Sequence, residues 1–362
     1  MVAVCGVSSL AAESVDGFVV EPESARLYLD MARKASLGSM PGDEEWDSLF
    51  SSAAYNAFLS HTGWDVQEFK SNVRNAFELA YDPARSAERD SVAASVQGID
   101  SELPLYLSTA MSIRERLDDY SAWLDSLNIG NTVEEARQLA LDLLPGRGAG
   151  LEPRTSPVYF IVWDLECRSL GSGIYLDLNT FLFDGPRVAT EILAHEMHHF
   201  YTQPCFEANY SGDISDPAAE ALVYNMMEGT ADIINKKRMP LTSLAPYGKD
   251  MLEIYNADYF ASPDVLRELD SVTCDYLDGK VSFEEYTDRA LGCAHFGGHT
   301  TGDYMVFMIR DNLGLESVVE SYGDIAGFVD NYNRAVAKGD GYRFSDRFVN
   351  HIREIDSAAR RK

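Results

Sequence analysis

The 362-residue sequence lacks a long apolar run, a CxxC pair and any internal repeat. No run reaches the ~18 apolar residues that a membrane-spanning helix needs, so we expect no membrane span. The first ten residues, MVAVCGVSSL, have none of the basic residues of a secretory signal, and we expect a cytoplasmic protein. The five cysteines are odd in number and widely spaced, which argues against a disulfide framework and against a cysteine zinc knuckle.

Basic residues are scarce as well. The chain has 58 Asp and Glu against 30 Lys and Arg, a formal net charge of −28, and residues 1–150 carry 24 acids and 11 bases, or −13 of that total. Such an evenly acidic surface argues against nucleic acid and anionic membranes as partners. Arg outnumbers Lys 22 to 8 and Asp outnumbers Glu 32 to 26, a composition typical of proteins kept soluble in high salt. A salt-adapted host and an ordinary acidic cytosolic protein both remain open.

The 46% hydrophobic content indicates a folded globular protein. Periodicity predicts an α+β fold that is predominantly α-helical, with few strands. The predicted helices before residue 150 are Ser24–Lys34, Glu44–Ser60, Asp65–Tyr81, Glu102–Leu127 and Thr132–Leu144, the last opened by a capping box of Thr132 and Glu135. The predicted strands are Val158–Trp163 and Gly173–Leu178.

The segment PGRGAGLEP, residues 145–153, gives the strongest loop signal in the chain. It predicts three parts: an N-terminal tail at 1–20, a helical region at 21–150, and a domain at 151–362 that carries the chemistry. The helical region has no chemical motif, and we interpret it as scaffolding.

The pentapeptide His195-Glu196-Met197-His198-His199 is an HExxH motif. On a helix, His195 and His199 project from one face and can bind a single metal ion, and Glu196 can take a proton from water beside it. Chance produces this spacing in roughly one such chain per hundred, so its context matters. The context is a predicted helix at 186–201 whose motif is surrounded by uncharged residues. The alternative is a core helix whose histidines bond to backbone carbonyls.

A catalytic zinc usually has three protein ligands, so a third is expected downstream. Asp216-Pro217 opens a second predicted helix that runs to about Arg238 and contains Glu228 and Asp232, four residues apart. Glu228 can complete a His, His, Glu set, and Asp232 can accept the other ring N–H of a zinc histidine. Gly229, in mid-helix at a cost of ~1 kcal/mol, predicts that another backbone packs closely there.

HExxH followed on a later helix by ExxxD resembles the gluzincin group of zinc metallopeptidases, over roughly residues 155 to 330. The resemblance implies a zincin-like catalytic core in which a small sheet precedes the HExxH helix, and one zinc per chain on His195, His199 and Glu228. Glu196 would be the general base, and Asp232 would hold a zinc ligand. The chain departs from the thermolysin-like members, which have Asn where Met227 stands, and its 28 residues between His199 and Glu228 are more than theirs. The strings EGTAD and TGDYM, at 228–232 and 301–305, are more similar to uncharacterised, predicted zinc-dependent peptidases of bacteria and archaea.

A peptidase also needs a donor for the oxyanion that develops on the substrate. The stretch at 295–304, HFGGHTTGDY, contains two histidines and three glycines and leads into a predicted helix at 304–312. His299 and Tyr304 are the candidate donors; the alternative is a plain loop before a helix.

The sequence therefore predicts a zinc peptidase that acts on a peptide or protein substrate by metal-assisted hydrolysis. A catalytically inactive metal-binding homologue remains open. A ferritin-like di-iron protein would need a second ExxH on another helix, which is missing here. Substrate specificity and oligomeric state do not follow from the sequence.

Overall fold

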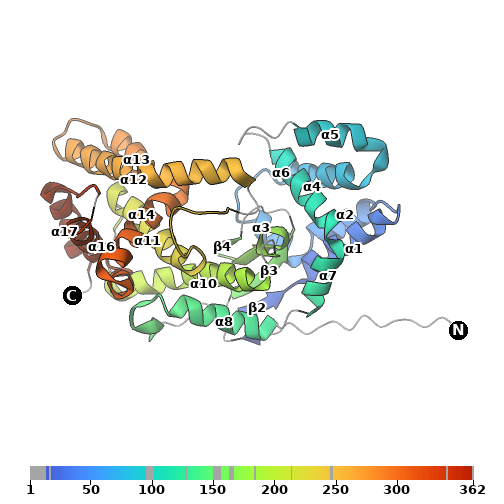
Figure 1. Ribbon diagram of the computed structural model, residues 1–362, viewed down its shortest axis with the longest axis horizontal. Helices are drawn as coiled ribbons and strands as arrows, with labels where there is room; N and C mark the ends of the chain where they lie inside the picture. The colour runs from blue at the N-terminus through green and yellow to red at the C-terminus, as the bar shows by residue number, and fades with distance from the viewer. Residues whose placement is uncertain are drawn as a thin grey trace. The chain divides into compact units, whose positions relative to one another are not determined.

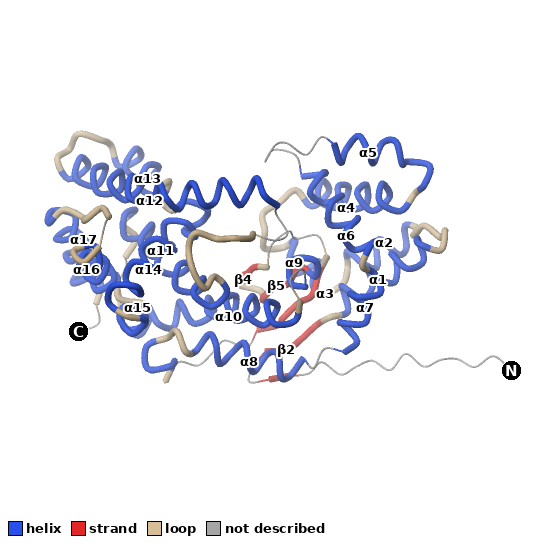
Figure 2. Tube along the Cα trace, viewed as in Figure 1, coloured by secondary structure: helices blue, strands red, loops and turns tan. Residues whose placement is uncertain are grey.

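The structure is a computed structural model that describes residues 14–15, 18–94, 102–126, 129–149, 156–162, 167–182, 185–212, 214–244, 248–339 and 341–360. Helices dominate these residues, and their strands lie in one small sheet that precedes the HExxH helix along the chain (Figure 1, Figure 2). The predicted α+β, predominantly helical fold is thus confirmed. Cys5 and most of the predicted tail at 1–20 lie outside the described residues. Within the described part, no helix has the length and apolarity needed to cross a membrane.

Contacts divide the chain into two compact units, which we describe separately. Unit 1 comprises residues 1–134 and 154–183, and unit 2 comprises residues 135–153 and 184–362. The strands thus group with the N-terminal helices, which is a different division from the boundary expected at residue 150. The three domains expected from the sequence stay a prediction.

Unit 1 contains the sheet, in the strand order β1-β2-β3-β5-β4. Its strands are β1 (Ser14–Val15), β2 (Phe18–Glu21), β3 (Ser156–Ile161), β4 (Arg168–Leu170) and β5 (Gly173–Asp177). The three central strands run parallel, with Val158 opposite Ile174, and β1 and β4 are antiparallel edges. Both predicted strands are confirmed as β3 and β5, although Trp163 lies outside the described residues. β1, β2 and β4 were not predicted because two to four residues are too short to show a period.

The helices of unit 1 largely follow the predicted amphipathic pattern. They are α1 (Glu23–Ser36), α2 (Asp43–Phe50), α3 (Ala53–Leu59), α4 (Val66–Tyr81), η1 (Pro83–Arg85), α5 (Ser86–Ala94), α6 (Glu102–Glu115), α7 (Leu117–Ser126) and α9 (Leu178–Leu182). The helix predicted at 44–60 is two helices, because Ser52 turns its hydroxyl onto the Leu49 carbonyl at 2.6 Å and interrupts the helical ladder.

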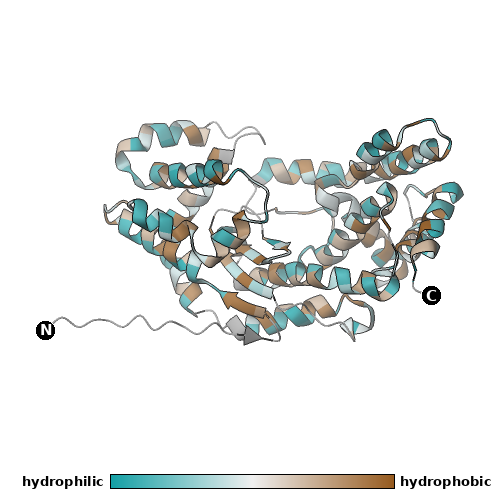
Figure 3. Cartoon of the chain, turned by 180° about the vertical axis from the view of Figure 1, so that it is seen from behind, coloured by the Kyte–Doolittle hydropathy of each residue, from teal (hydrophilic) through white to brown (hydrophobic). Residues whose placement is uncertain are grey.

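Helix α8 (Ile129–Leu141) spans the division between the units. It begins three residues before Thr132, which therefore lies inside the helix, so the predicted capping box is wrong. Along the helices of the chain, hydrophilic and hydrophobic residues alternate (Figure 3).

Unit 2 is built around buried helices. Its elements are η2 (Pro145–Gly148), α10 (Pro186–Asn209), α11 (Pro217–Asn235), α12 (Gly248–Leu277), α13 (Phe283–Leu291), η3 (His295–Gly298), α14 (His299–Leu313), α15 (Leu315–Ser321), α16 (Ile325–Val336) and α17 (Asp346–Ala359). The start of α11 is as predicted: Asp216 Oδ1 accepts the N–H groups of Ala218 and Ala219 at 3.0 and 3.2 Å, and Pro217 is the first helical residue. Helix α14 begins at His299, five residues earlier than predicted, and most of it is buried.

Candidate metal centre

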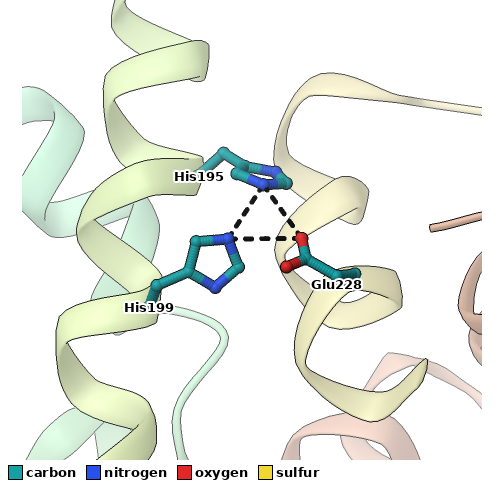
Figure 4. A group of neighbouring side chains, drawn as sticks. All are labelled: His195, His199 and Glu228. Carbon is teal, nitrogen blue, oxygen red and sulfur yellow. Dashed lines mark hydrogen bonds and ion pairs between the residues drawn. The ribbon is translucent and has the colours of Figure 1, made fainter. Parts of the chain in front are cut away.

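Helix α10 supplies the two histidines of the HExxH motif. Their Nε2 atoms lie 3.0 Å apart, because a spacing of four residues puts both side chains on one face of the helix (Figure 4). The side chains are nearly buried, at 7% and 13% exposure for His195 and His199.

Helix α11 brings Glu228 to the same point. Its Oε2 lies 3.4 Å from His195 Nε2 and 3.3 Å from His199 Nε2, which closes the triangle of Figure 4. Ligand atoms bound 2.0–2.1 Å from one tetrahedral zinc lie about 3.3–3.4 Å from one another. Among the described residues, these three form the one set of His, Cys, Asp or Glu side chains close enough to share a metal ion. The donor set, two imidazoles and a carboxylate, fits zinc with a fourth position left for a reactant.

Asp232, one helical turn after Glu228, is completely buried and contacts two histidines. Its Oδ1 lies 3.3 Å from His195 Nδ1, and its Oδ2 lies 2.8 Å from His299 Nδ1. A carboxylate only accepts hydrogen bonds, so His299 Nδ1 carries the hydrogen, an assignment inferred from the acceptor. In His195, Nε2 is the ring nitrogen that faces His199 and Glu228 and can bind metal with them.

His299 lies at the start of α14, beside the triangle. Its Nε2 is 3.5 Å from Glu228 Oε2, and its ring stacks on that of His195 with centroids 5.8 Å apart. The side chain is 34% exposed, so it can be reached from solvent.

Glycines explain why α14 comes so close to α11. A Cβ on Gly229 would lie 2.4 Å from the backbone of Gly302, and a Cβ on Gly302 would lie 2.2 Å from the Asn225 carbonyl oxygen. The close backbone approach predicted from Gly229 is confirmed. A third glycine, Gly298, has φ +104° and packs in the same way on the backbone of Tyr224. These contacts fix the first turn of α14 against the face that carries Glu228.

The ionisable groups of the centre shift one another's pKa values. Burial lowers the pKa of His195, but its contacts with the Asp232 and Glu228 carboxylates outweigh burial and raise that pKa well above its usual value. Burial raises the pKa of Glu228, yet the histidines around it hold that pKa well below the usual range. Burial likewise raises the pKa of Asp232, but the charges of Lys236 and His299 hold it well below its usual value. The two carboxylates are therefore charged and ready to bind a cation or a protonated imidazole.

Three further residues belong to this cluster and were not predicted. Lys236 Nζ lies 2.5 Å from Asp232 Oδ2 and 2.6 Å from Tyr255 Oη, and Tyr255 donates to Asp303 Oδ2 at 2.9 Å. Asp303 lies in the TGDYM string, but neither a period nor a motif gives it a role. Lys236 follows Asp232 by four residues, and this spacing was the available signal.

Glu196 and Tyr304 are the two remaining residues predicted to take part in catalysis. Glu196 is buried, at 5% exposure, beside His195. Tyr304 packs against the rings of Tyr259 and Tyr332, with centroids 5.7 and 6.4 Å away, in the core of unit 2. This position gives no support to its expected role as oxyanion donor, whereas His299 is close to the ligands.

His198, the remaining histidine of the motif, packs in the core. It is fully buried, and its ring lies against that of Tyr322 with centroids 4.6 Å apart. Burial lowers the pKa of His198 to about 3, so the side chain is a neutral packing residue.

Two histidines and a glutamate that converge from two helices give this helix-rich α+β chain the arrangement of an HExxH metal site. Residues 46–341 match the model of one protein family, described as "Putative zinc dependent peptidase (DUF5700)", and the chain belongs to that family. No curated protein and no solved structure matches it. The family description and the convergence of His195, His199 and Glu228 agree with the zinc-dependent peptidase class that the sequence predicted.

Proposed function

We propose that the protein is a gluzincin-type peptidase, which hydrolyses peptide bonds with one zinc ion per chain held by His195, His199 and Glu228. The observation that carries the proposal is the triangle formed by the two histidine Nε2 atoms and Glu228 Oε2, whose sides measure 3.0–3.4 Å. Glu196, the glutamate of the HExxH motif, directly follows His195 in the chain. A zinc ion bound there supplies a Lewis acid that acidifies water and polarises a carbonyl group.

Glu196 is the general base in this proposal. Its carboxylate takes a proton from the attacking water and delivers it to the amine that leaves when the peptide bond breaks. The buried position of Glu196 keeps bulk water from competing for that proton.

His299 stabilises the charge on the substrate oxygen. Its Nδ1–H is held by Asp232 at 2.8 Å, which fixes the ring and turns Nε2 toward the ligands. A hydrogen bond from Nε2 to the oxyanion completes this role, while Nδ1–H stays on the Asp232 carboxylate. Tyr304, the other expected oxyanion donor, stays a prediction.

Glu196→Gln tests the proposal most simply. The amide cannot accept the proton, so we expect the rate of hydrolysis of a peptide library to fall by about 10²–10⁴-fold. The zinc content should stay unchanged. Glu207→Gln, an exposed carboxylate on the same helix that bonds Gln203, is the matched control and should remain fully active.

The same variants decide between the proposal and an inactive metal-binding homologue. A wild-type protein that binds zinc and cleaves no peptide would identify the inactive homologue. Loss of zinc from the Glu196→Gln protein would refute the role of Glu196 as a base, because that role leaves the ligands untouched.

A further inference from the structure

We propose that Lys236, Tyr255 and Asp303 form a positioning unit that holds the Asp232 carboxylate, so that this one carboxylate orients His195 and His299 together. The unit joins the metal site to the oxyanion donor, and for His299 it depends on the proposed function above.

The contacts form a continuous chain across three helices. Lys236, directly after the end of α11, contacts Asp232 Oδ2 at 2.5 Å and Asp303 Oδ2 at 3.4 Å. Tyr255 on α12 accepts from Lys236 Nζ at 2.6 Å and donates to Asp303 on α14 at 2.9 Å. The Lys236 ammonium thus has three oxygen partners, which matches its three hydrogens.

Asp232 is the point at which this unit meets the candidate metal centre. Its Oδ1 lies against His195, while Oδ2 is shared by His299 and Lys236. A carboxylate held only by the two imidazoles could turn about its last torsion, which is broad for aspartate. The contact with Lys236 fixes the plane of the carboxylate, and both rings follow that plane.

Stability alone does not account for this arrangement. Asp232 and Asp303 are completely buried and the Lys236 side chain is only 13% exposed, so all three polar groups have lost most of their water. Replacing buried ion pairs with apolar residues of similar volume is often neutral or stabilising. A buried cluster of this kind is therefore better explained by the geometry that it imposes on its neighbours.

The test measures zinc affinity, by competition with a chelator, and kcat and KM for Lys236→Met and Tyr255→Phe. We expect each to weaken zinc binding by about 10–100-fold, as for other groups that support metal ligands. At saturating zinc, kcat should fall more than KM changes, because His299 is displaced while substrate contacts elsewhere remain. Tyr255→Phe removes a single oxygen and keeps the test valid if Lys236→Met does not fold.

Tyr210→Phe is the matched control. The Tyr210 hydroxyl is buried, donates to Asp356 Oδ1 at 2.6 Å and accepts the Ile325 N–H at 3.0 Å, so it resembles Tyr255 but donates to a different aspartate. Its removal should change zinc affinity less than about two-fold, since it leaves the support of the ligands intact.

A double-mutant cycle separates positioning from general stabilisation. If Lys236 acts through Asp232, then Lys236→Met should have no further effect on zinc affinity in an Asp232→Asn background. Additive losses, or unchanged zinc affinity in both Lys236→Met and Tyr255→Phe, would overturn the inference. Zinc binding with the expected coupling but without hydrolysis would instead refute the proposed function and leave the positioning unit in place.

Discussion

Asp216 contacts three helices through its two carboxylate oxygens. Its Oδ1 caps α11 and accepts the Tyr286 hydroxyl at 2.8 Å, while its Oδ2 lies 3.0 Å from His351 Nε2. Asp216 thus ties the helix that carries Glu228 to α13 and α17. Burial would raise the pKa of Asp216, but its contacts with His351 and Tyr286 outweigh burial and lower that pKa.

This shift predicts a pH dependence of stability. A carboxyl group with a lowered pKa in the folded state stabilises the protein above its unfolded pKa, near 3.8, and loses that contribution as the pH falls through the folded value. We expect Asp216→Asn, which retains a capping oxygen, to be less stable than wild type by about 1–2 kcal/mol at pH 5. The difference should shrink below about pH 4. Urea unfolding at several pH values measures it, and a difference that grew on acidification would contradict the assignment.

At the residue scale, the sequence predicts the candidate metal ligands because their spacing is local. His195 and His199 need only one helix, and Glu228 needs only a second. Lys236 and Tyr255 meet Asp303 through tertiary packing of three helices, and no local pattern encodes such a meeting.

The expected role of Tyr304 shows the same limit. Tyr304 was a reasonable candidate by its place in the chain, close after His299. Once both residues belong to α14, however, a side chain five positions from His299 points to another face of the helix. The start of α14 at His299, five residues before the predicted start, thus gives the two side chains different directions.

At the scale of elements, the crossing of α11 and α14 is the contact that brings His299 close to Glu228 and His195. Gly229 and Gly302 meet there backbone to backbone. Gly229 alone indicated the contact in the sequence, and its partner could not be identified because Gly302 is 73 residues away.

Gly229→Ala tests the importance of this crossing. Helix propensity favours alanine by ~1 kcal/mol. The added Cβ, however, would lie 2.4 Å from the Gly302 backbone, and overpacking costs about 1–3 kcal/mol or more. We therefore expect a net loss of stability in urea unfolding together with weaker zinc binding. Gly171→Ala, where nothing lies within 4 Å of the added Cβ, should have little effect. A stabilised Gly229→Ala protein would show that the two helices can separate without consequence.

Element boundaries were predicted less well than element types. Helix α10 extends to Asn209, eight residues beyond the predicted end, because Pro204 does not stop it. The helix predicted at 44–60 is divided at Ser52, and α8 starts three residues before its predicted start at Thr132. Side-chain hydrogen bonds and packing override weak local preferences at such boundaries.

For the whole molecule, the net charge of −28 is the dominant property. Like charges repel in the compact state, and salt screens this repulsion, with a screening length of about 10 Å at 0.1 M and about 3 Å at 1 M. On the hypothesis of a salt-adapted host, the free energy of unfolding should rise continuously from low to molar KCl. Thermal unfolding across that range is the measurement, and unfolding at high KCl would refute the hypothesis.

The metal content of the purified protein is the most direct test of the central claim. Mass spectrometry should find about one zinc per chain in the wild type and none in His199→Ala. The control His61→Ala removes an exposed histidine whose Nδ1 lies 2.9 Å from the Ala57 carbonyl oxygen, and it should retain zinc. A folded wild-type protein without metal, or one with about two irons per chain, would contradict the proposed zinc centre.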